Sequence, residues 1–245
     1  MKVIPLSEGT FTIDKTKQFV PFDTDKDDLQ QRPVGSLLVE IQPFVVITSE
    51  DVLLLDTGLG FTNENGRLQL HQNLIDNGIN PGEVTKVLMT HLHKDHSGGV
   101  AIGSGKDRTL SFPQARYYIQ KQEMEYVYEK GFPSYIPEEL DCLKDAPQVT
   151  WLNGNGVIDG YIKYEITGAH SKYHQAFWIV DGGETVFFGG DDAPQLQQMR
   201  SRFVAKYDYD GKKSMELRQQ WWQQGEKERW KFLFYHDVKN PTWEF

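Results

Sequence analysis

The six residues from His91 to His96 constrain this chain more than any other feature of its sequence. They contain three imidazoles and one carboxylate, which are His91, His93, Asp95 and His96. Neutral imidazole and ionised carboxylate are the ligands that borderline divalent cations prefer. The apolar run Val87–Met89 precedes them, and an extended backbone points residues i and i+2 to the same side. The motif therefore predicts a metal site at the C-terminal end of a strand.

Further candidate ligands also follow apolar runs, and these are His170, Asp191 and His236. Loops at strand ends commonly carry functional groups because the scaffold beneath them is rigid. One tetrahedral cation cannot use all four residues of the first motif together with these further ligands, so the pattern predicts two metal ions. Asp56 follows the apolar run 52–55 and suits a supporting role, in which it accepts a hydrogen bond from a ligating imidazole.

Alternating strand and helix signals predict a sheet-on-sheet core with helices outside, in the α+β class. We expect strands at 37–41, 44–47, 52–55, 85–89, 161–166, 177–180, 185–188 and 232–235. Helices are expected at 67–77, in the second part of 117–130, and at 213–230, and another is expected to begin near Gly98-Gly99. No linker-like stretch divides the chain, so we expect a single domain over residues 1–245.

Composition excludes several classes of function. A net charge of −9 and a pI near 5.3 disfavour binding to nucleic acid. Cys142 is the only cysteine, so neither an intrachain disulfide nor a thiolate metal site can form. The N-terminus lacks the apolar core of a signal peptide, and no apolar run is long enough to span a membrane. We therefore expect a cytoplasmic protein without membrane contact. Trp221, Trp222 and Trp230 are expected to pack internally or to form a homodimer contact.

The ordered set of these elements resembles the metallo-β-lactamase superfamily of hydrolases. The resemblance extends from about residue 37 to residue 236 and is carried by Asp56-Thr57-Gly58, the His91–His96 motif, His170, Asp191 and His236. It implies a four-layer αββα sandwich with the site at one edge of the paired sheets. It also implies that His91, His93 and His170 hold one metal, that Asp95, His96 and His236 hold the other, and that Asp191 bridges them.

The same resemblance implies hydrolysis by a metal-bridging hydroxide, since bound cations bring the pKa of water towards neutrality. We assign Asp95 and Asp191 a catalytic role in addition to metal binding. Asp191 is favoured over Asp192 as the bridge because it directly follows Gly190. His174 is expected to support the ligands or to form a pocket wall. Lys94 and Lys172 flank ligand loops and could meet an anionic substrate group, although a solvated side chain is the commoner role for each.

Finer features resemble the branch that contains methyl parathion hydrolase-like and lactonase-like enzymes. They are Phe112-Pro113-Gln114-Ala115 before Tyr117-Tyr118, and Tyr207-Asp208-Tyr209-Asp210 before a helix with Arg218. Two departures stand out. The segment before His174 reads Ser-Lys-Tyr where the family often has Thr-Pro-Gly. Pro194 occupies the position at which acyl-homoserine lactonases carry a tyrosine that polarises the substrate.

The sequence thus favours a dinuclear metal-dependent hydrolase of a small ester, lactone or organophosphate-like substrate. Zinc is the favoured metal, with iron and manganese as alternatives. One rival is a mononuclear iron oxygenase of the same fold that resembles persulfide dioxygenases. The other is a non-catalytic metal-binding protein on this scaffold. The aromatic residues of 117–135 are expected to belong to the core, with a roof over the pocket as the alternative.

Overall fold

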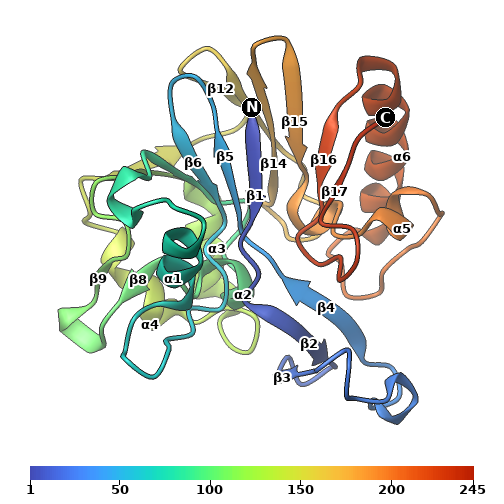
Figure 1. Cartoon of the computed structure of the whole chain (residues 1–245), viewed down its shortest axis with the longest axis horizontal. Coiled ribbons are helices and arrows are strands. Elements are labelled where there is room, and N and C mark those ends of the chain that lie inside the picture. The colour runs from blue at the N-terminus through green and yellow to red at the C-terminus, as the bar shows by residue number, and fades with distance from the viewer.

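Two six-stranded β-sheets, packed face to face, form the centre of the computed structural model, which describes residues 1–245 (Figure 1). The first sheet has the order β1 (Lys2–Pro5), β5 (Phe44–Ile47), β6 (Val52–Leu55), β7 (Lys86–Leu88), β10 (Arg116–Gln120) and β11 (Val149–Leu152). The second has the order β12 (Gly156–Ile158), β13 (Ile162–Ile166), β14 (Gln175–Asp181), β15 (Glu184–Phe188), β16 (Lys231–Leu233) and β17 (Thr242–Trp243).

Helices cover the outer face of each sheet, which completes the predicted four layers. The helices are α1 (Gln69–Asp76), α2 (Lys94–Ser97), α3 (Lys121–Lys130), α4 (Pro137–Leu140), α5 (Leu196–Met199) and α6 (Gly211–Glu228). Residues of α1, α3 and α4 share a buried cluster with the first sheet, and residues of α5 and α6 share one with the second. None of the helices has the length and apolar character needed to cross a membrane.

The strand β6 shows how the sequence builds these layers. Leu53 and Leu55 belong to the cluster between the sheets, whereas Leu54 belongs to the outer cluster. All three side chains are fully buried. A strand directs successive side chains to opposite faces, so an unbroken apolar run marks a strand that is covered on both sides.

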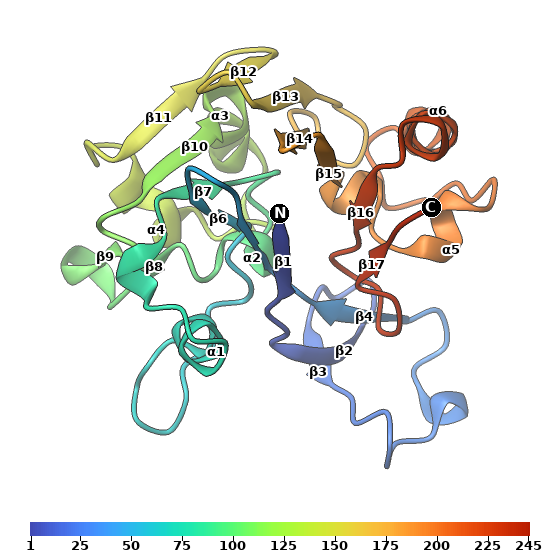
Figure 2. The same cartoon turned by 45° about the horizontal axis from the view of Figure 1, so that its top comes forward.

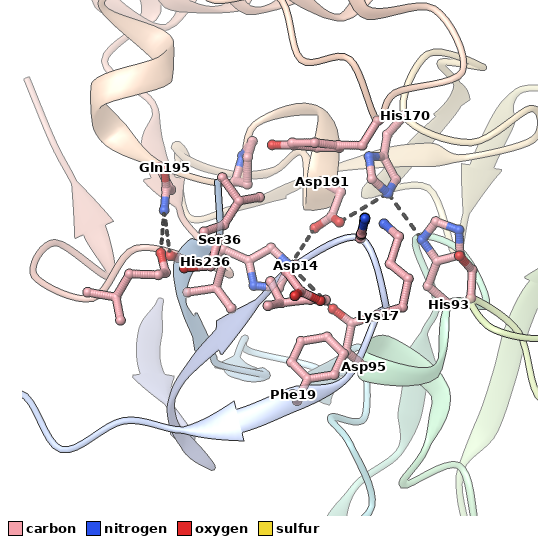
Figure 3. Close-up of a pocket in the computed structure, with 18 of the residues that line it drawn as sticks. Asp14, Lys17, Phe19, Ser36, His93, Asp95, His170, Asp191, Gln195 and His236 are labelled. Carbon is pink, nitrogen blue, oxygen red and sulfur yellow. Dashed lines mark hydrogen bonds and ion pairs between the residues drawn. The ribbon is translucent and has the colours of Figure 1, made fainter. Parts of the chain in front are cut away.

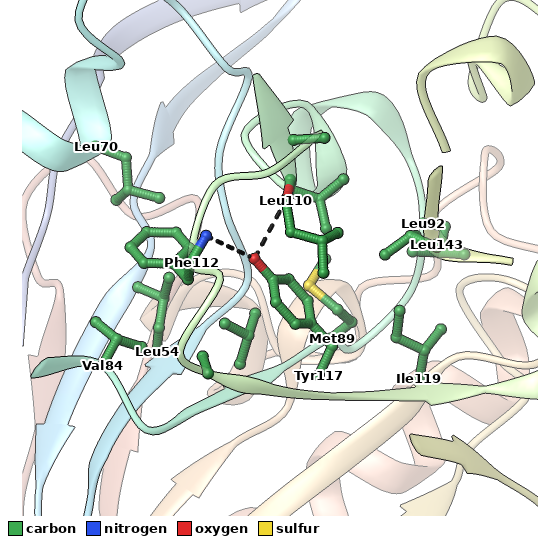
Figure 4. Packing of buried hydrophobic residues seen from close by; sticks show 14 of the residues in the cluster. Leu54, Leu70, Val84, Met89, Leu92, Leu110, Phe112, Tyr117, Ile119 and Leu143 are labelled. Carbon is green, nitrogen blue, oxygen red and sulfur yellow. Dashed lines mark hydrogen bonds between the residues drawn. The ribbon is translucent and has the colours of Figure 1, made fainter. Parts of the chain in front are cut away.

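The outer cluster of the first sheet also accommodates a buried phenol (Figure 4). The hydroxyl of Tyr117 accepts a hydrogen bond from the Phe112 N–H at 3.0 Å and donates to the Val100 carbonyl at 3.4 Å. These bonds offset the cost of removing the hydroxyl from water. Tyr117 is therefore a core residue, as the sequence predicted.

The region after the His91–His96 motif differs from the prediction. No helix begins at Gly98-Gly99; the short helix α2 ends at Ser97 instead. The glycines allow a close approach of two backbones, because a Cβ on Gly99 would lie 2.1 Å from the Thr57 carbonyl oxygen. The loop that carries Thr57 occupies the space that a side chain would need.

A three-stranded sheet in the N-terminal region extends beyond the two main sheets (Figure 2). It has the order β3 (Phe19–Pro21), β2 (Gly9–Ile13) and β4 (Leu37–Ile41). A further two-stranded sheet pairs β8 (Ala101–Ile102) with β9 (Thr109–Leu110). The antiparallel register of β2 and β4 pairs Phe11 with Val39. This pairing places the turn between β2 and β3 beside the strand ends that carry the candidate ligands.

Candidate metal centre

The structure brings all seven predicted ligands together at one edge of the paired sheets. The His91–His96 motif follows β7 of the first sheet, and the other three ligands follow β13, β15 and β16 of the second. The ligand atoms form two groups, which are His91, His93, His170 and Asp191 in one and Asp95, His96 and His236 in the other. Within each group every ligand atom lies within 4.8 Å of the others.

The first group surrounds the His93 Nδ1 atom. His91 Nε2 lies 2.9 Å from it, and His170 Nε2 lies 3.1 Å from it. His170 Nε2 also lies 3.1 Å from Asp191 Oδ2. Three imidazole nitrogens and one carboxylate oxygen therefore converge on one small volume.

The second group faces the other oxygen of Asp191 (Figure 3). Asp191 Oδ1 lies 3.1 Å from His96 Nε2 and 3.0 Å from His236 Nε2. Asp95 Oδ2 lies 3.5 Å from His236 Nε2. Asp191 thus presents one oxygen to each group, as a bridging carboxylate does.

The unsatisfied atoms of the centre fit a metal. His96 Nε2 and Asp191 Oδ1 are buried without a hydrogen bond of acceptable geometry, although they lie 3.1 Å apart. Buried polar atoms are nearly always satisfied, so such a pair needs a partner. A divalent cation between nitrogen and oxygen donors supplies one, and the imidazole and carboxylate set suits zinc.

In three of the five ligand imidazoles, the nitrogen that faces away from the centre lies within hydrogen-bond distance of a specific acceptor. His96 Nδ1 lies 2.8 Å from Asp56 Oδ2, and His170 Nδ1 lies 2.8 Å from Asp208 Oδ1. His236 Nδ1 donates to the Glu40 carbonyl at 2.7 Å. A proton held on Nδ1 leaves Nε2 as the free donor atom, which fixes the tautomer that a metal requires. Asp56 has the supporting position that its place in the sequence predicted.

His174 lies behind Asp191 and not in the cavity wall. Its Nε2 accepts a hydrogen bond from the Asp191 N–H at 3.2 Å, and its Nδ1 lies 3.0 Å from Asp192 Oδ2. Gly190, at φ 51°, permits this approach, because a Cβ there would lie 2.7 Å from His174 Nε2. His174 therefore fixes the backbone of the bridging carboxylate.

Asp192, which the sequence analysis did not favour as the bridge, is a supporting residue of the centre. It is fully buried, and its Oδ1 accepts a hydrogen bond from the His170 N–H at 2.7 Å. Its backbone carbonyl accepts a hydrogen bond from the buried guanidinium of Arg218 at 3.0 Å. Asp192 thus connects the loop of His170 to His174, the residue that holds the backbone of Asp191.

The charge states of the metal-free centre follow from burial and from neighbouring charges. Burial and the adjacent imidazoles hold the pKa of His91 and of His93 well below the usual value, so both rings are neutral. Burial opposes ionisation of Asp191, but the imidazoles of His236, His96 and His170 outweigh it and hold the pKa of this carboxyl well below its usual range. Burial opposes protonation of His96, His170 and His236, but the charge of Asp191 outweighs it and raises the pKa of all three rings. A cation that binds here must displace protons from these rings, so metal binding depends on pH.

A cavity of about 590 Å³ opens onto the centre, and its wall comes mainly from segments for which the sequence predicted no role in the site. The residues 13–19 and 32–39 of the N-terminal region line it, together with 194–207. From the segment 117–135 only Ser134 contributes. Lys94 lines the cavity, but Lys172 does not, so only one of the two flanking lysines can meet a bound molecule.

Two supporting residues were missed by the sequence analysis. Asp208, which holds His170, lies within the Tyr207–Asp210 motif, so its neighbourhood but not its role was recognised. Glu123 is buried beneath the ligand loops, where Oε1 accepts hydrogen bonds from the Leu92 N–H at 3.2 Å and the Tyr135 hydroxyl at 3.1 Å. A lone glutamate in an amphipathic helix carries no sequence signal for such a role.

The sequence model of the metallo-beta-lactamase superfamily matches residues 39–219, which hold six of the seven ligands. The chain belongs to the metallo-β-lactamase superfamily. Within this superfamily it is 31% identical over 115 residues to the N-acyl homoserine lactonase AttM of Azorhizobium caulinodans. That match covers 42% of the chain and 38% of the relative's length.

Solved structures of the superfamily share the fold over nearly the whole chain. A probable metal-dependent hydrolase from Staphylococcus aureus superposes with a TM-score of 0.79 at 20% identity, covering 99% of this chain and 91% of that one. AidC, described as a dizinc quorum-quenching lactonase in complex with a product, superposes with a TM-score of 0.73 at 18% identity, covering 98% and 88%. At identities this low, the superpositions establish a shared fold and nothing further.

Proposed function

We propose that this protein is a dinuclear metal-dependent hydrolase of small ester or lactone substrates, with organophosphate-like esters as a related class. The observation that carries the proposal is the placement of Asp191, whose two oxygens face two separate groups of imidazoles. The lactonases among the relatives, one of them described as dizinc, support the substrate class and the metal.

When two divalent cations are bound, they supply an activated water and polarise the substrate carbonyl or phosphoryl group. The residues of the chain supply the geometry. His91, His93 and His170 would hold one cation, Asp95, His96 and His236 the other, and Asp191 both. Asp56, Asp208 and the Glu40 carbonyl orient three of these rings, and a preorganised centre avoids the cost of rearrangement during the reaction.

Metal analysis together with a substrate panel tests the proposal. The purified protein is analysed for metal content and assayed against a chromogenic ester, a lactone, a phosphotriester and a cephalosporin. We expect about two zinc ions per chain, and hydrolysis of the ester or the lactone that a chelator abolishes and added zinc restores. His93→Ala should lose metal and activity together.

Three results would contradict the proposal. Full turnover by metal-free His93→Ala would exclude a role for metal. One iron per chain, with consumption of dioxygen in place of hydrolysis, would favour the oxygenase. Two tightly bound metals with no turnover of any member of the panel would favour a binding protein.

A further inference from the structure

We infer that the substrate carries an anionic group, a carboxylate or a phosphate, at a distance from the bond that is hydrolysed. This inference rests on the proposed function and specifies its substrate. Five cationic side chains line the cavity in front of the metal centre, and they are Lys15, Lys17, Arg32, Lys94 and Lys206. Lys15 and Lys17 share one turn, and the other three come from three further segments. The cavity therefore gathers positive charge although the net charge of the chain is −9.

None of these five cations is paired with a carboxylate within 4.0 Å. Ion pairs occupy many of the other lysines of the chain, such as Lys86 with Asp51 at 2.5 Å and Lys144 with Asp141 at 2.9 Å. Unpaired like charges around a cavity repel one another, and a bound anion relieves that repulsion. The cavity is therefore complementary to a negatively charged molecule.

The carboxylates of the cavity do not neutralise this charge. Asp95 and Asp191 belong to the metal groups. Asp14, the remaining one, is engaged by its own turn, because its Oδ1 accepts hydrogen bonds from the Thr16 N–H at 2.8 Å and the Thr16 hydroxyl at 2.6 Å. These bonds hold Asp14 in the backbone turn, and no ion pair joins it to a lysine of the cavity.

Lys17 is the cavity cation whose ammonium lies over the ring of Tyr207, 5.7 Å from its centroid, and that ring packs against the imidazole of His170. Lys17 is half-buried and lies among Asp191, His170 and His93 in the close-up view (Figure 3). Its backbone has a φ of 59°, the left-handed conformation that favours glycine or asparagine. Unfavourable backbone conformations persist at functional sites, where the side chain gives a benefit that glycine cannot. The geometry therefore identifies Lys17 as the main contact for the anionic group.

Two esters with the same leaving group test the inference by kinetics. The zinc-loaded protein is assayed with p-nitrophenyl hemisuccinate, which carries a free carboxylate, and with the neutral p-nitrophenyl butyrate. We expect kcat/KM to be at least about tenfold higher for the hemisuccinate, the size of one charge-assisted hydrogen bond. Lys17→Gln should lower the ratio of the two values about tenfold, mainly through the KM of the hemisuccinate. The matched control Lys172→Gln, which lies outside the cavity, should leave the ratio unchanged.

Binding without turnover supplies an independent measurement. Calorimetry compares succinate, 3-phosphonopropionate and butyrate on the zinc-loaded protein and on Lys17→Gln. Tighter binding of either dianion than of butyrate, lost in Lys17→Gln, supports the inference, and the tighter dianion identifies the preferred group. Equal binding of all three, or an equal kcat/KM for both esters, overturns it while leaving the hydrolase proposal intact. If neither these esters nor any member of the substrate panel is hydrolysed but a dianion binds through Lys17, the proposed function fails and the anion site remains.

Discussion

Asp191 is the residue on which both groups of the metal centre depend. Its two oxygens face different imidazoles, and its backbone N–H is held by His174. Asp192, its neighbour in the chain, is fully buried, and its side chain contacts the His170 N–H and the His174 ring instead of the metal-facing atoms. Adjacent carboxylates of equal charge therefore have separable roles, which makes them a matched pair for mutation.

Asp191→Asn should reduce metal content more than Asp192→Asn does. An amide supplies one neutral oxygen where the bridge needs two anionic ones, so we expect about one metal or fewer per chain in Asp191→Asn. Asp192→Asn loosens the His170 loop, and loss of such a supporting partner costs about 10–100-fold in affinity or activity. Elemental analysis after dialysis measures both variants. The reverse order of metal contents would transfer the bridging role to Asp192.

The sequence predicted functional residues best where a residue type has few roles other than metal binding. The convergence of seven candidate ligands could be predicted because imidazoles and carboxylates after apolar strands have few other uses. Asp208 and the Glu40 carbonyl could not be assigned in the same way. A carboxylate on a loop has many possible partners, and a backbone carbonyl has no sequence signature, so their roles depend on how distant segments pack.

Among the elements, buried strands matched the prediction better than exposed ones. The strands at 37–41, 44–47 and 52–55 have the predicted bounds, because apolar runs between turn residues leave little choice. The strands β1, β2 and β3 were not predicted. β1 and β2 mix polar with apolar residues, and β3 has only three residues and is largely exposed, so no clear apolar pattern marks them. The cavity wall they build depends on the pairing of β2 with β4 across the chain.

In the turn between β2 and β3, replacing Lys17 with glycine should make the protein more stable but weaken its activity on an anionic ester. Lys17→Gly relieves the left-handed strain at φ 59° and should raise the free energy of unfolding by about 0.5–1 kcal/mol. The same change removes the cation from the cavity, so kcat/KM for an anionic ester should fall. Urea denaturation and steady-state kinetics on one preparation measure both effects. A less stable Lys17→Gly would show that the turn is not strained.

Glu8, in the segment between β1 and β2, should make stability depend on pH. Burial raises the pKa of this carboxyl from 4.5 to about 7, although the N–H groups of Leu59 and Gly60 oppose the shift. The folded state therefore holds the Glu8 proton more tightly than the unfolded state does. Its contribution is complete below pH 4.5 and is lost as the pH rises through about 7, by up to about 3 kcal/mol.

Glu8→Gln should remove this part of the pH dependence, because an amide does not titrate. Urea denaturation of both proteins at pH 5 and pH 8, in chelator, measures the difference. The loss of stability between the two pH values should be smaller in Glu8→Gln than in the parent protein. An equal loss in both would assign the pH dependence to other groups.

At the scale of the whole molecule, the metal centre joins the two sheets. Four of its ligands follow β7 of the first sheet, and three follow strands of the second. Metal that binds only the folded state stabilises it in proportion to the logarithm of its concentration over its Kd. Bound metal should therefore raise the free energy of unfolding of the protein, in addition to its role in catalysis.

Removal of metal should lower the melting temperature. A metal present at a thousand times its Kd contributes about 4 kcal/mol, which corresponds to a fall of about 8–16 °C for a chain of this size. Calorimetry with and without a chelator measures the change. Asp191→Asn, which holds less metal, should respond less. A melting temperature that is indifferent to the chelator would show that the cations do not tie the sheets together.

The hydrogen bond between His236 Nδ1 and the Glu40 carbonyl joins residues 196 positions apart in the chain. His91 and His93, by contrast, are only two positions apart and meet without any long-range pairing. Closing so large a loop comes late when a chain acquires its structure, because distant segments must first find each other. During biosynthesis the ion that His236 helps to hold should accordingly be captured last, and a half-matured protein would carry its first cation while still waiting for the second.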